Sequence, residues 1–225
     1  MKKVIERKLW LGAAFFAAFV LWTVLASWVD VQPIGPNGSS VGFATVNGFV
    51  HDGFGVHWWL YTVTDWLGLV PIGIAFGFAV LGLVQLVKRK SLLKVDRSIL
   101  VLGGFYILVF AAYFLFEKVA INYRPVLIDG YLEASYPSST TMLVLCVIPT
   151  AMMQLKTRIR SKALKDVVIL ALALFAAFMV IGRLVSGVHW LTDIIGGVLF
   201  SVGLVMLYAR ACQMADLGCR KMTGA

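Results

Sequence analysis

Long apolar runs alternate with short polar connections along the whole chain. Six of these runs reach or approach the roughly 17 to 25 residues that a helix needs to cross about 30 Å of hydrocarbon. Backbone amides in lipid must be satisfied within their own segment, so runs of this length predict helices and not strands. The pattern predicts an all-α bundle of six transmembrane helices. These are expected at about 9–29, 60–87, 99–116, 138–155, 167–182 and 193–209.

Composition supports a membrane protein. Hydrophobic residues make up 60% of the chain and charged residues only 14%, whereas about a quarter of the residues in a soluble domain are charged. We find no linker, low-complexity tract or internal repeat, so one membrane-embedded domain over residues 1–225 is the simplest organisation. Cys146, Cys212 and Cys219 form no Cys-x-x-Cys pair, and we expect neither a metal site nor another cofactor.

Most basic residues gather in four clusters between or outside the apolar runs. Cytoplasmic connections collect Lys and Arg, so we expect both termini, loop 88–98 and loop 156–166 inside, and loops 30–59, 117–137 and 183–192 outside. The net charge of +9 then reflects membrane topology, and nucleic acid is not an expected partner. The clusters are Lys2, Lys3, Arg7 and Lys8; Lys88, Arg89, Lys90, Lys94 and Arg97; Lys156, Arg158, Arg160, Lys162 and Lys165; and Arg210, Arg220 and Lys221.

Three cations remain, and all of them fall in or next to outer loops. Lys118 and Arg124 border or occupy one loop, and Arg183 ends the fifth apolar run. An arginine embedded in a membrane is costly unless it is paired, and one guanidinium can bind two phosphoryl oxygens. The three cations therefore predict a site for a phosphoryl group on the extracytoplasmic side. The alternative is that each of them reaches the lipid headgroups and binds nothing else.

His189 and Asp193 are the strongest candidates for chemistry. They are four residues apart, so a last helix that begins near His189 stacks both side chains on one face. The carboxylate can then hold one imidazole nitrogen and leave the other free to attack phosphorus. The alternative is an interfacial histidine that is capped by an aspartate and does not react.

Three short segments carry a resemblance to a known family. The first has Lys118 and Arg124-Pro125, the second is Pro137-Ser138-Ser139-Thr140, and the third has Arg183, His189 and Asp193 after Gly182. In this order, and with six predicted helices, the chain resembles the type 2 phosphatidic acid phosphatase superfamily, the lipid phosphate phosphatases related to vanadium haloperoxidases. Family members have six residues between Lys and Arg-Pro where this chain has five, serine in place of Gly182, and Pro-Ser-Gly-His as the second motif.

The resemblance implies a role for each matching position. His189 is implied to be the nucleophile, Asp193 its partner, and Arg124, Ser138 and Arg183 ligands of the phosphate oxygens. Lys118, Ser139 and Thr140 complete the expected phosphate site. Thr140 stands where the family has the histidine that serves as general acid, so the second motif diverges.

The missing general acid bears on the substrate. Without such an acid, release of a poor leaving group such as a lipid alkoxide slows by a factor of about 10² to 10⁴. A phosphate released from a diphosphate is far more acidic and needs little protonation. We therefore expect a lipid diphosphate, such as a polyprenyl diphosphate of wall synthesis in a bacterial plasma membrane. A lipid phosphotransferase, a non-catalytic lipid-phosphate binder or transporter, and Glu133 as a replacement proton donor stay open as alternatives.

Overall fold

The computed structural model describes the backbone of residues 2–223 and the side chains of residues 6–215. Five residues named above lie outside the described side chains. They are Lys2, Lys3, Cys219, Arg220 and Lys221. Over this range the chain is helical and forms no strand beyond isolated β-bridges. The helices are α1 (Lys2–Trp28), η1 (Pro36–Gly38), α2 (Ala44–Phe54), α3 (Trp58–Leu67), α4 (Leu69–Arg89), η2 (Leu92–Lys94), α5 (Arg97–Lys118), α6 (Ser139–Arg158), α7 (Lys162–Val185) and α8 (Leu191–Thr223).

Within the described part of the chain, six helical segments are long and apolar enough to cross a membrane, which confirms the predicted fold class. The second of them, Trp58–Arg89, joins α3 to α4. The apolar run expected at about 60–87 is thus a single candidate membrane span that consists of two helices. The two helices meet at Gly68, whose amide bonds back to the carbonyls of Thr64 and Asp65 at 3.1 and 3.0 Å. Pro71 follows in the first turn of α4, where its missing N–H costs little.

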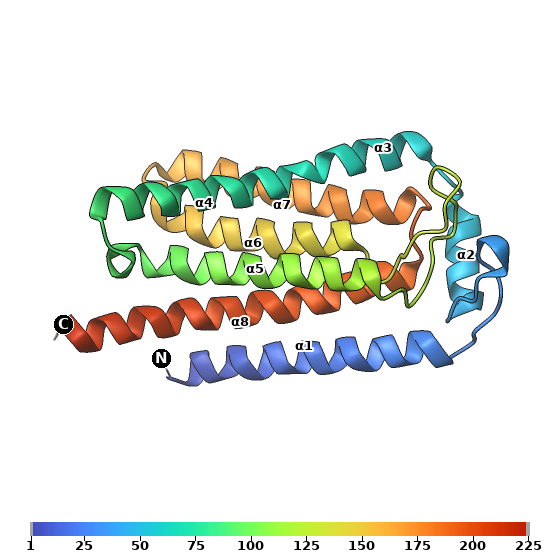
Figure 1. Ribbon diagram of the computed structural model, residues 1–225, viewed down its shortest axis with the longest axis horizontal. Coiled ribbons are helices and arrows are strands. Elements are labelled where there is room, and N and C mark those ends of the chain that lie inside the picture. The colour runs from blue at the N-terminus through green and yellow to red at the C-terminus, as the bar shows by residue number, and fades with distance from the viewer. Residues whose placement is uncertain (1, 224–225) are drawn as a thin grey trace.

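α6 and α8 form the centre of the bundle. They pack against each other, α1 covers α8, and α7 covers α6. Just over half of the apolar window of α6 and of α8 is buried, 56% in each, compared with at most 33% in the other four spans. α6 is also the least apolar of the six spans, because its polar side chains face other helices and not lipid. Figure 1 shows the long helices running side by side.

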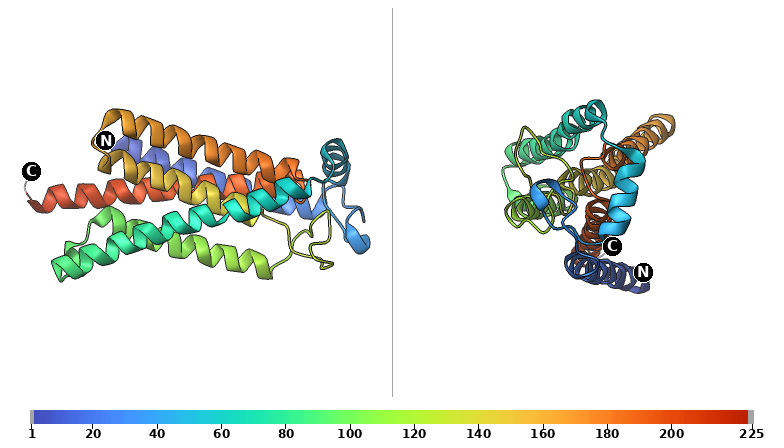
Figure 2. Two further views of the ribbon diagram at one scale, coloured as in Figure 1. Left: turned by 90° about the horizontal axis from the view of Figure 1, so that it is seen from above. Right: turned by 90° about the vertical axis from the view of Figure 1, so that its right-hand side faces the viewer.

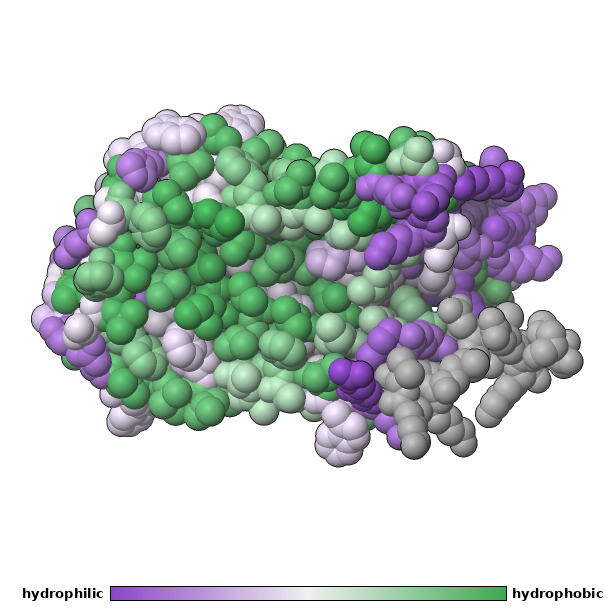
Figure 3. All heavy atoms as spheres, turned by 180° about the vertical axis from the view of Figure 1, so that it is seen from behind, coloured by the Kyte–Doolittle hydropathy of each residue, from purple (hydrophilic) through white to green (hydrophobic). Residues whose placement is uncertain are grey.

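The distribution of apolar and polar residues on the surface agrees with a helix bundle that spans a membrane. An apolar band surrounds the middle of the molecule, and hydrophilic residues gather towards one end of it (Figure 3). That end holds the start of α1, the end of α8 and the α4–α5 and α6–α7 connections, so the described basic residues of the first three clusters lie there (Figure 1). The opposite end carries α2 and the long connection between α5 and α6.

α2 lies across this second end of the bundle, as Figure 2 shows. Asn47 fixes α2 to the start of α8. Its amide donates to the Gly42 carbonyl at 2.8 Å and to the Thr192 hydroxyl at 3.0 Å, and its carbonyl accepts the Thr192 N–H at 3.2 Å. Loop 30–59 is thus packed onto the bundle directly beside the chain's candidate chemical groups.

Candidate active site

His189 and Asp193 lie together at the end of the bundle that α2 covers. His189 is in the connection between α7 and α8, and Asp193 is in the first turn of α8. Both are buried, with 3% and 0% of their surface exposed. Because α8 begins at Leu191, the two residues do not share a helix face, and that expectation is corrected. The distance from His189 Nδ1 to Asp193 Oδ2 is 3.7 Å, too long for a hydrogen bond.

Ser135 bridges the two groups. Its hydroxyl lies 3.1 Å from His189 Nδ1 and donates to Asp193 Oδ2. The same carboxylate oxygen accepts the Trp190 N–H at 2.9 Å. The connection between α5 and α6 holds Ser135 in place, because the Ser135 N–H donates to the Asn122 carbonyl at 2.8 Å. The histidine and the aspartate are therefore connected through a third side chain.

Two arginines approach the other side of the imidazole. Nη1 of Arg124 is 3.3 Å from His189 Nε2, and Nη2 of Arg183 is 3.5 Å from it. A guanidinium can only donate, so the favourable arrangement places a lone pair on Nε2 and the proton on Nδ1. The Ser135 oxygen is then the acceptor for this proton. The network thus favours the tautomer in which Nε2 carries the free lone pair.

The surroundings keep this histidine neutral. Burial lowers the pKa of His189 well below its usual value of about 6.5, and the charges of Arg124 and Arg183 lower it further. Both effects disfavour the imidazolium. At neutral pH the ring therefore retains the lone pair that an attack on phosphorus requires.

A polar cavity of about 590 Å³ opens over the two arginines. Arg183 is 1% exposed, its guanidinium lies over the Tyr61 ring at 5.1 Å, and Nη1 is 3.5 Å from Asp65 Oδ1. Arg124 is 7% exposed, and its Nε is 3.0 Å from Glu133 Oε2. The cavity is lined by Tyr61, Asp65, Gly68, Leu69, Ile72, Tyr113, Glu117, Arg124, Leu132, Glu133, Ala134, Ser139, Thr140, Leu143 and Arg183.

The predicted phosphate ligands separate into three groups. Arg124, Arg183, Ser139 and Thr140 line this cavity. Ser138 is buried behind it, where its hydroxyl accepts the Thr141 N–H at 3.4 Å at the start of α6 and its own N–H donates to the Asp193 carbonyl at 3.1 Å. Lys118 is exposed at the end of α5, outside the cavity lining.

Two glycines allow the close approaches on which the site depends. A Cβ at Gly182 would lie 2.8 Å from Thr64 Cγ2, so a larger residue there would push α7 away from α3. Thr64 accepts a hydrogen bond from Arg183 at 3.4 Å across this contact. Gly187 has a φ of +70°, and its missing Cβ would meet the Gly55 carbonyl at 2.0 Å.

Sequence reasoning missed Ser135 and the buried Asn122, whose main-chain carbonyl accepts the Ser135 N–H. Each stands a few residues from a recognised motif, but neither residue type is distinctive in itself. Ser135 is 54 residues from His189 along the chain, and only the fold brings them together. Its one sequence signal is its position directly before Tyr136-Pro137-Ser138.

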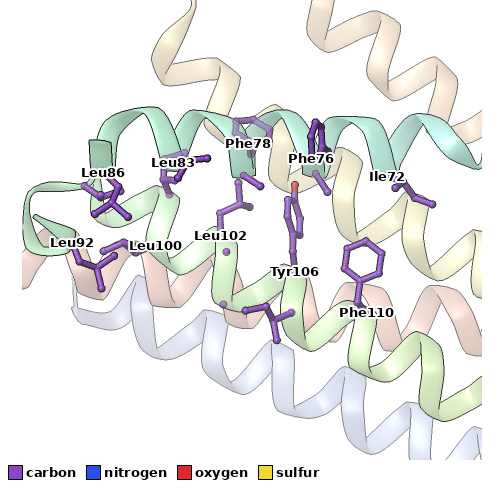
Figure 4. Close-up of a pocket in the computed structure, with 18 residues that line it drawn as sticks. Ile72, Phe76, Phe78, Leu83, Leu86, Leu92, Leu100, Leu102, Tyr106 and Phe110 are labelled. Carbon is purple, nitrogen blue, oxygen red and sulfur yellow. The ribbon is translucent and has the colours of Figure 1, made fainter. Parts of the chain in front are cut away.

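An apolar groove of about 630 Å³ lies next to the polar cavity, between α4 and α5. Figure 4 shows the side chains of both helices that face it, from Ile72 and Phe110 at one end to Leu86 and Leu92 at the other. Ile72 lines the groove and the polar cavity alike. The apolar groove and the polar cavity that holds the arginines are therefore neighbours, with Ile72 at their common boundary.

Comparison with known proteins identifies the family. The family model described as the PAP2 superfamily matches residues 102–216, just over half of the chain. The chain belongs to this superfamily. The matched range contains Arg124, Ser135, Arg183, His189 and Asp193, and the protein is an integral membrane lipid phosphatase.

One solved structure and the curated proteins complete the comparison. The crystal structure of the first transmembrane PAP2 type phosphatidylglycerolphosphate phosphatase from Bacillus subtilis is similar, with 21% sequence identity and a TM-score of 0.49. The alignment covers 88% of this chain and 93% of that one. No curated protein matches the chain.

Proposed function

We propose that this PAP2 protein hydrolyses a lipid diphosphate, preferentially a polyprenyl diphosphate, at the extracytoplasmic face of a bacterial plasma membrane. One observation carries the proposal. A buried, neutral imidazole presents Nε2 to two buried guanidinium groups, at 3.3 and 3.5 Å, under a polar cavity. This arrangement combines a nucleophile with the cations that bind the group under attack.

The reaction follows from these positions. Arg124 and Arg183 bind oxygens of the terminal phosphoryl group, with Ser139 and Thr140 at the cavity wall. Nε2 of His189 attacks phosphorus, the bond from phosphorus to the bridging oxygen breaks, and the leaving lipid phosphate takes the bonding electrons. Water then attacks the phosphohistidine, the electron pair of the P–N bond returns to Nε2, and inorganic phosphate leaves.

The preference for a diphosphate rests on the threonine that replaces the family's second-motif histidine. Thr140 lines the cavity at the position where the family has histidine. Asp65 and Glu133 line it as well, but each is paired with an arginine, at 3.5 and 3.0 Å. Each of these carboxylates is therefore engaged with a phosphate-binding arginine and is not positioned as a proton donor to the leaving group. A leaving lipid phosphate requires no such donor.

The apolar groove between α4 and α5 is evidence for a substrate with a lipid tail. Fourteen residues separate Ile72 from Leu86 on α4, both of which line the groove, and a helix rises roughly 21 Å over that length. A single leaflet accounts for about half of a hydrocarbon core of roughly 30 Å. A groove of this length can hold one extended lipid tail beside the polar cavity.

The basic clusters support the sidedness. The described Lys and Arg residues of the α4–α5 and α6–α7 connections lie at the end opposite α2 (Figure 1). By the positive-inside rule that end faces the cytoplasm. The cavity over Arg124 and Arg183 then opens on the extracytoplasmic side.

Phosphate release by the purified protein tests the proposal. A panel of polyprenyl diphosphate, polyprenyl phosphate and phosphatidic acid is compared, with His189→Ala as the control. We expect the fastest release from the diphosphate, a ³²P-labelled protein that is absent in His189→Ala, and no labelled lipid product. Faster release from phosphatidic acid contradicts the substrate preference, labelled lipid in place of phosphate identifies a transferase, and an unlabelled, inactive protein identifies a binder.

A lipid phosphate monoester is the second candidate, and one observation favours it. Glu117 also lines the cavity, and within the described part of the chain it forms no ion pair with an arginine. It could donate a proton to an alkoxide. In that case Glu117→Gln slows monoester hydrolysis by about 10² or more, whereas the diphosphate reaction proposed here is unaffected by this change.

A further inference from the structure

Among the side chains that the structure describes, Ser135 is the one that contacts both His189 Nδ1 and the Asp193 carboxylate. It is 3% exposed, lies 3.1 Å from Nδ1 and donates to Oδ2. The direct separation between Nδ1 and Oδ2 is 3.7 Å. A histidine whose ring is positioned only by the aspartate would need that distance to be near 3 Å.

The main chain fixes Ser135 independently of the histidine. The Ser135 N–H donates to the Asn122 carbonyl at 2.8 Å, and the Arg124 N–H donates to the Glu133 carbonyl at 3.0 Å. The next residue, Tyr136, is 1% exposed, and its hydroxyl is 2.7 Å from that of Thr23 on α1. The same backbone pairing therefore sets the positions of both Arg124 and Ser135, one on each side of the imidazole.

We propose that Ser135 is a positioning residue that relays the effect of Asp193 to His189. The Nδ1 proton is donated to the Ser135 oxygen, and the Ser135 hydroxyl proton is donated to Asp193 Oδ2. This chain of two hydrogen bonds keeps the proton on Nδ1 and the lone pair on Nε2. The proposal rests on the phosphohistidine reaction for its effect on rate, but the relay itself is a property of the resting protein.

The relay acts through charge and not through proton transfer. When Nε2 forms its bond to phosphorus and the leaving group departs with its electrons, the ring becomes positively charged and retains its Nδ1 proton. The Ser135 dipole and the buried carboxylate behind it stabilise that charge. When water breaks the P–N bond, the ring is neutral again and the two hydrogen bonds are unchanged.

Substitution at Ser135 tests the relay. Loss of a hydrogen bond to a group that becomes charged costs roughly 10- to 100-fold, so we expect Ser135→Ala to lower kcat by that factor and to change KM by less than about 2-fold. Ser135→Thr keeps the hydroxyl and should restore most of the rate. Ser201→Ala is the matched control, because Ser201 is also fully buried but donates to the Met142 carbonyl at 3.3 Å, away from the site; its kcat should be unchanged.

The histidine tautomer provides a second readout that requires no substrate. In ¹⁵N NMR of His189 we expect a protonated Nδ1 and a bare Nε2 in the native protein, and a mixture of tautomers in Ser135→Ala. If the native protein hydrolyses no lipid phosphate, the proposed function fails while the spectrum still tests the relay. An unchanged kcat and an unchanged tautomer in Ser135→Ala overturn the relay. If that variant does not fold, Ser135→Cys, a weak donor of similar size, is measured in its place with the same expected losses.

Discussion

Polar clusters with similar residue types occupy opposite ends of the bundle, and we name them inner and outer after the orientation proposed above. The inner cluster is centred on Asp96, which accepts a hydrogen bond from Gln85 at 2.9 Å and pairs with Arg89 at 2.9 Å and Arg158 at 3.4 Å. The outer cluster consists of Arg124, Arg183, His189, Asp193 and Ser135. In the inner cluster two arginines share one carboxylate, whereas in the outer cluster two arginines converge on an imidazole nitrogen.

Burial separates the two clusters further. The side chains of Arg89, Asp96 and Arg158 are 43%, 39% and 26% exposed, so water solvates all three charges. Those of Arg183 and Arg124 are 1% and 8% exposed. Burying a charge without a fully buried partner costs several kcal/mol, and native proteins accept such a cost mainly at functional sites. We therefore expect the inner cluster to serve folding and topology, and the outer cluster to serve the proposed chemistry.

Removing one arginine from each cluster is the most demanding test of this contrast. Arg183→Ala removes a cation that stabilises the transferring phosphoryl group, and we expect kcat/KM to fall by about 10³. Arg158→Ala should lower kcat/KM by less than about 2-fold. Phosphate release from polyprenyl diphosphate, measured on protein confirmed as folded by its melting curve, gives both values. Comparable losses in the two variants would mean that the outer arginine has no special role.

The contrast can be sharpened by adding a group to the outer cluster. Thr140→His restores a general acid at the wall of the cavity, so we expect hydrolysis of phosphatidic acid to rise by about 10². The rate with polyprenyl diphosphate should change only a few-fold, because its leaving group needs no proton. Thr140→Asn, which is polar but does not titrate, is the control, and an equal rise in both variants contradicts the role of the proton.

Much of this fold follows from the sequence, because a span of lipid core requires a long apolar run. The break at Gly68 did not follow, since Gly68 and Pro71 stand in a run that remains apolar on both sides. The residues of the site likewise include some that the sequence predicts and some that it does not. Arg124, Arg183 and His189 are polar residues in apolar or loop context and stand out, but the start of α8 at Leu191 and the contact of Ser135 with His189 depend on tertiary packing.

The pH dependence of kcat/KM tests the electrostatics of the outer cluster, and the expected effect is smaller than those above. Burial and the two arginines lower the pKa of His189 below 6.5, so we expect the acid limb of kcat/KM to lie below pH 6.5. Arg124→Gln removes one of the two charges and should shift that limb upwards, in addition to lowering the plateau. The same lowered pKa predicts that the free energy of unfolding decreases as the pH is lowered below 6.5. At such pH the unfolded chain binds a proton on His189 that the folded site does not bind. An acid limb at or above pH 6.5 in the native protein would contradict a neutral, buried His189.

The smallest effect on activity is expected at the centre of the inner cluster. Asp96→Asn removes the charge that Arg89 and Arg158 share but keeps an acceptor for Gln85. Partly exposed ion pairs contribute up to about 1 kcal/mol, which corresponds to a fall in Tm of about 3 °C for a chain of this size. For Asp96→Asn we expect that fall in Tm, a Tm that depends less on salt, and a kcat within about 2-fold of the native value. Asp193→Asn is the counterpart in the outer cluster, and we expect it to lose activity. A large loss of turnover in Asp96→Asn would show that the two ends of the bundle are coupled, and the separation of folding from chemistry would not hold.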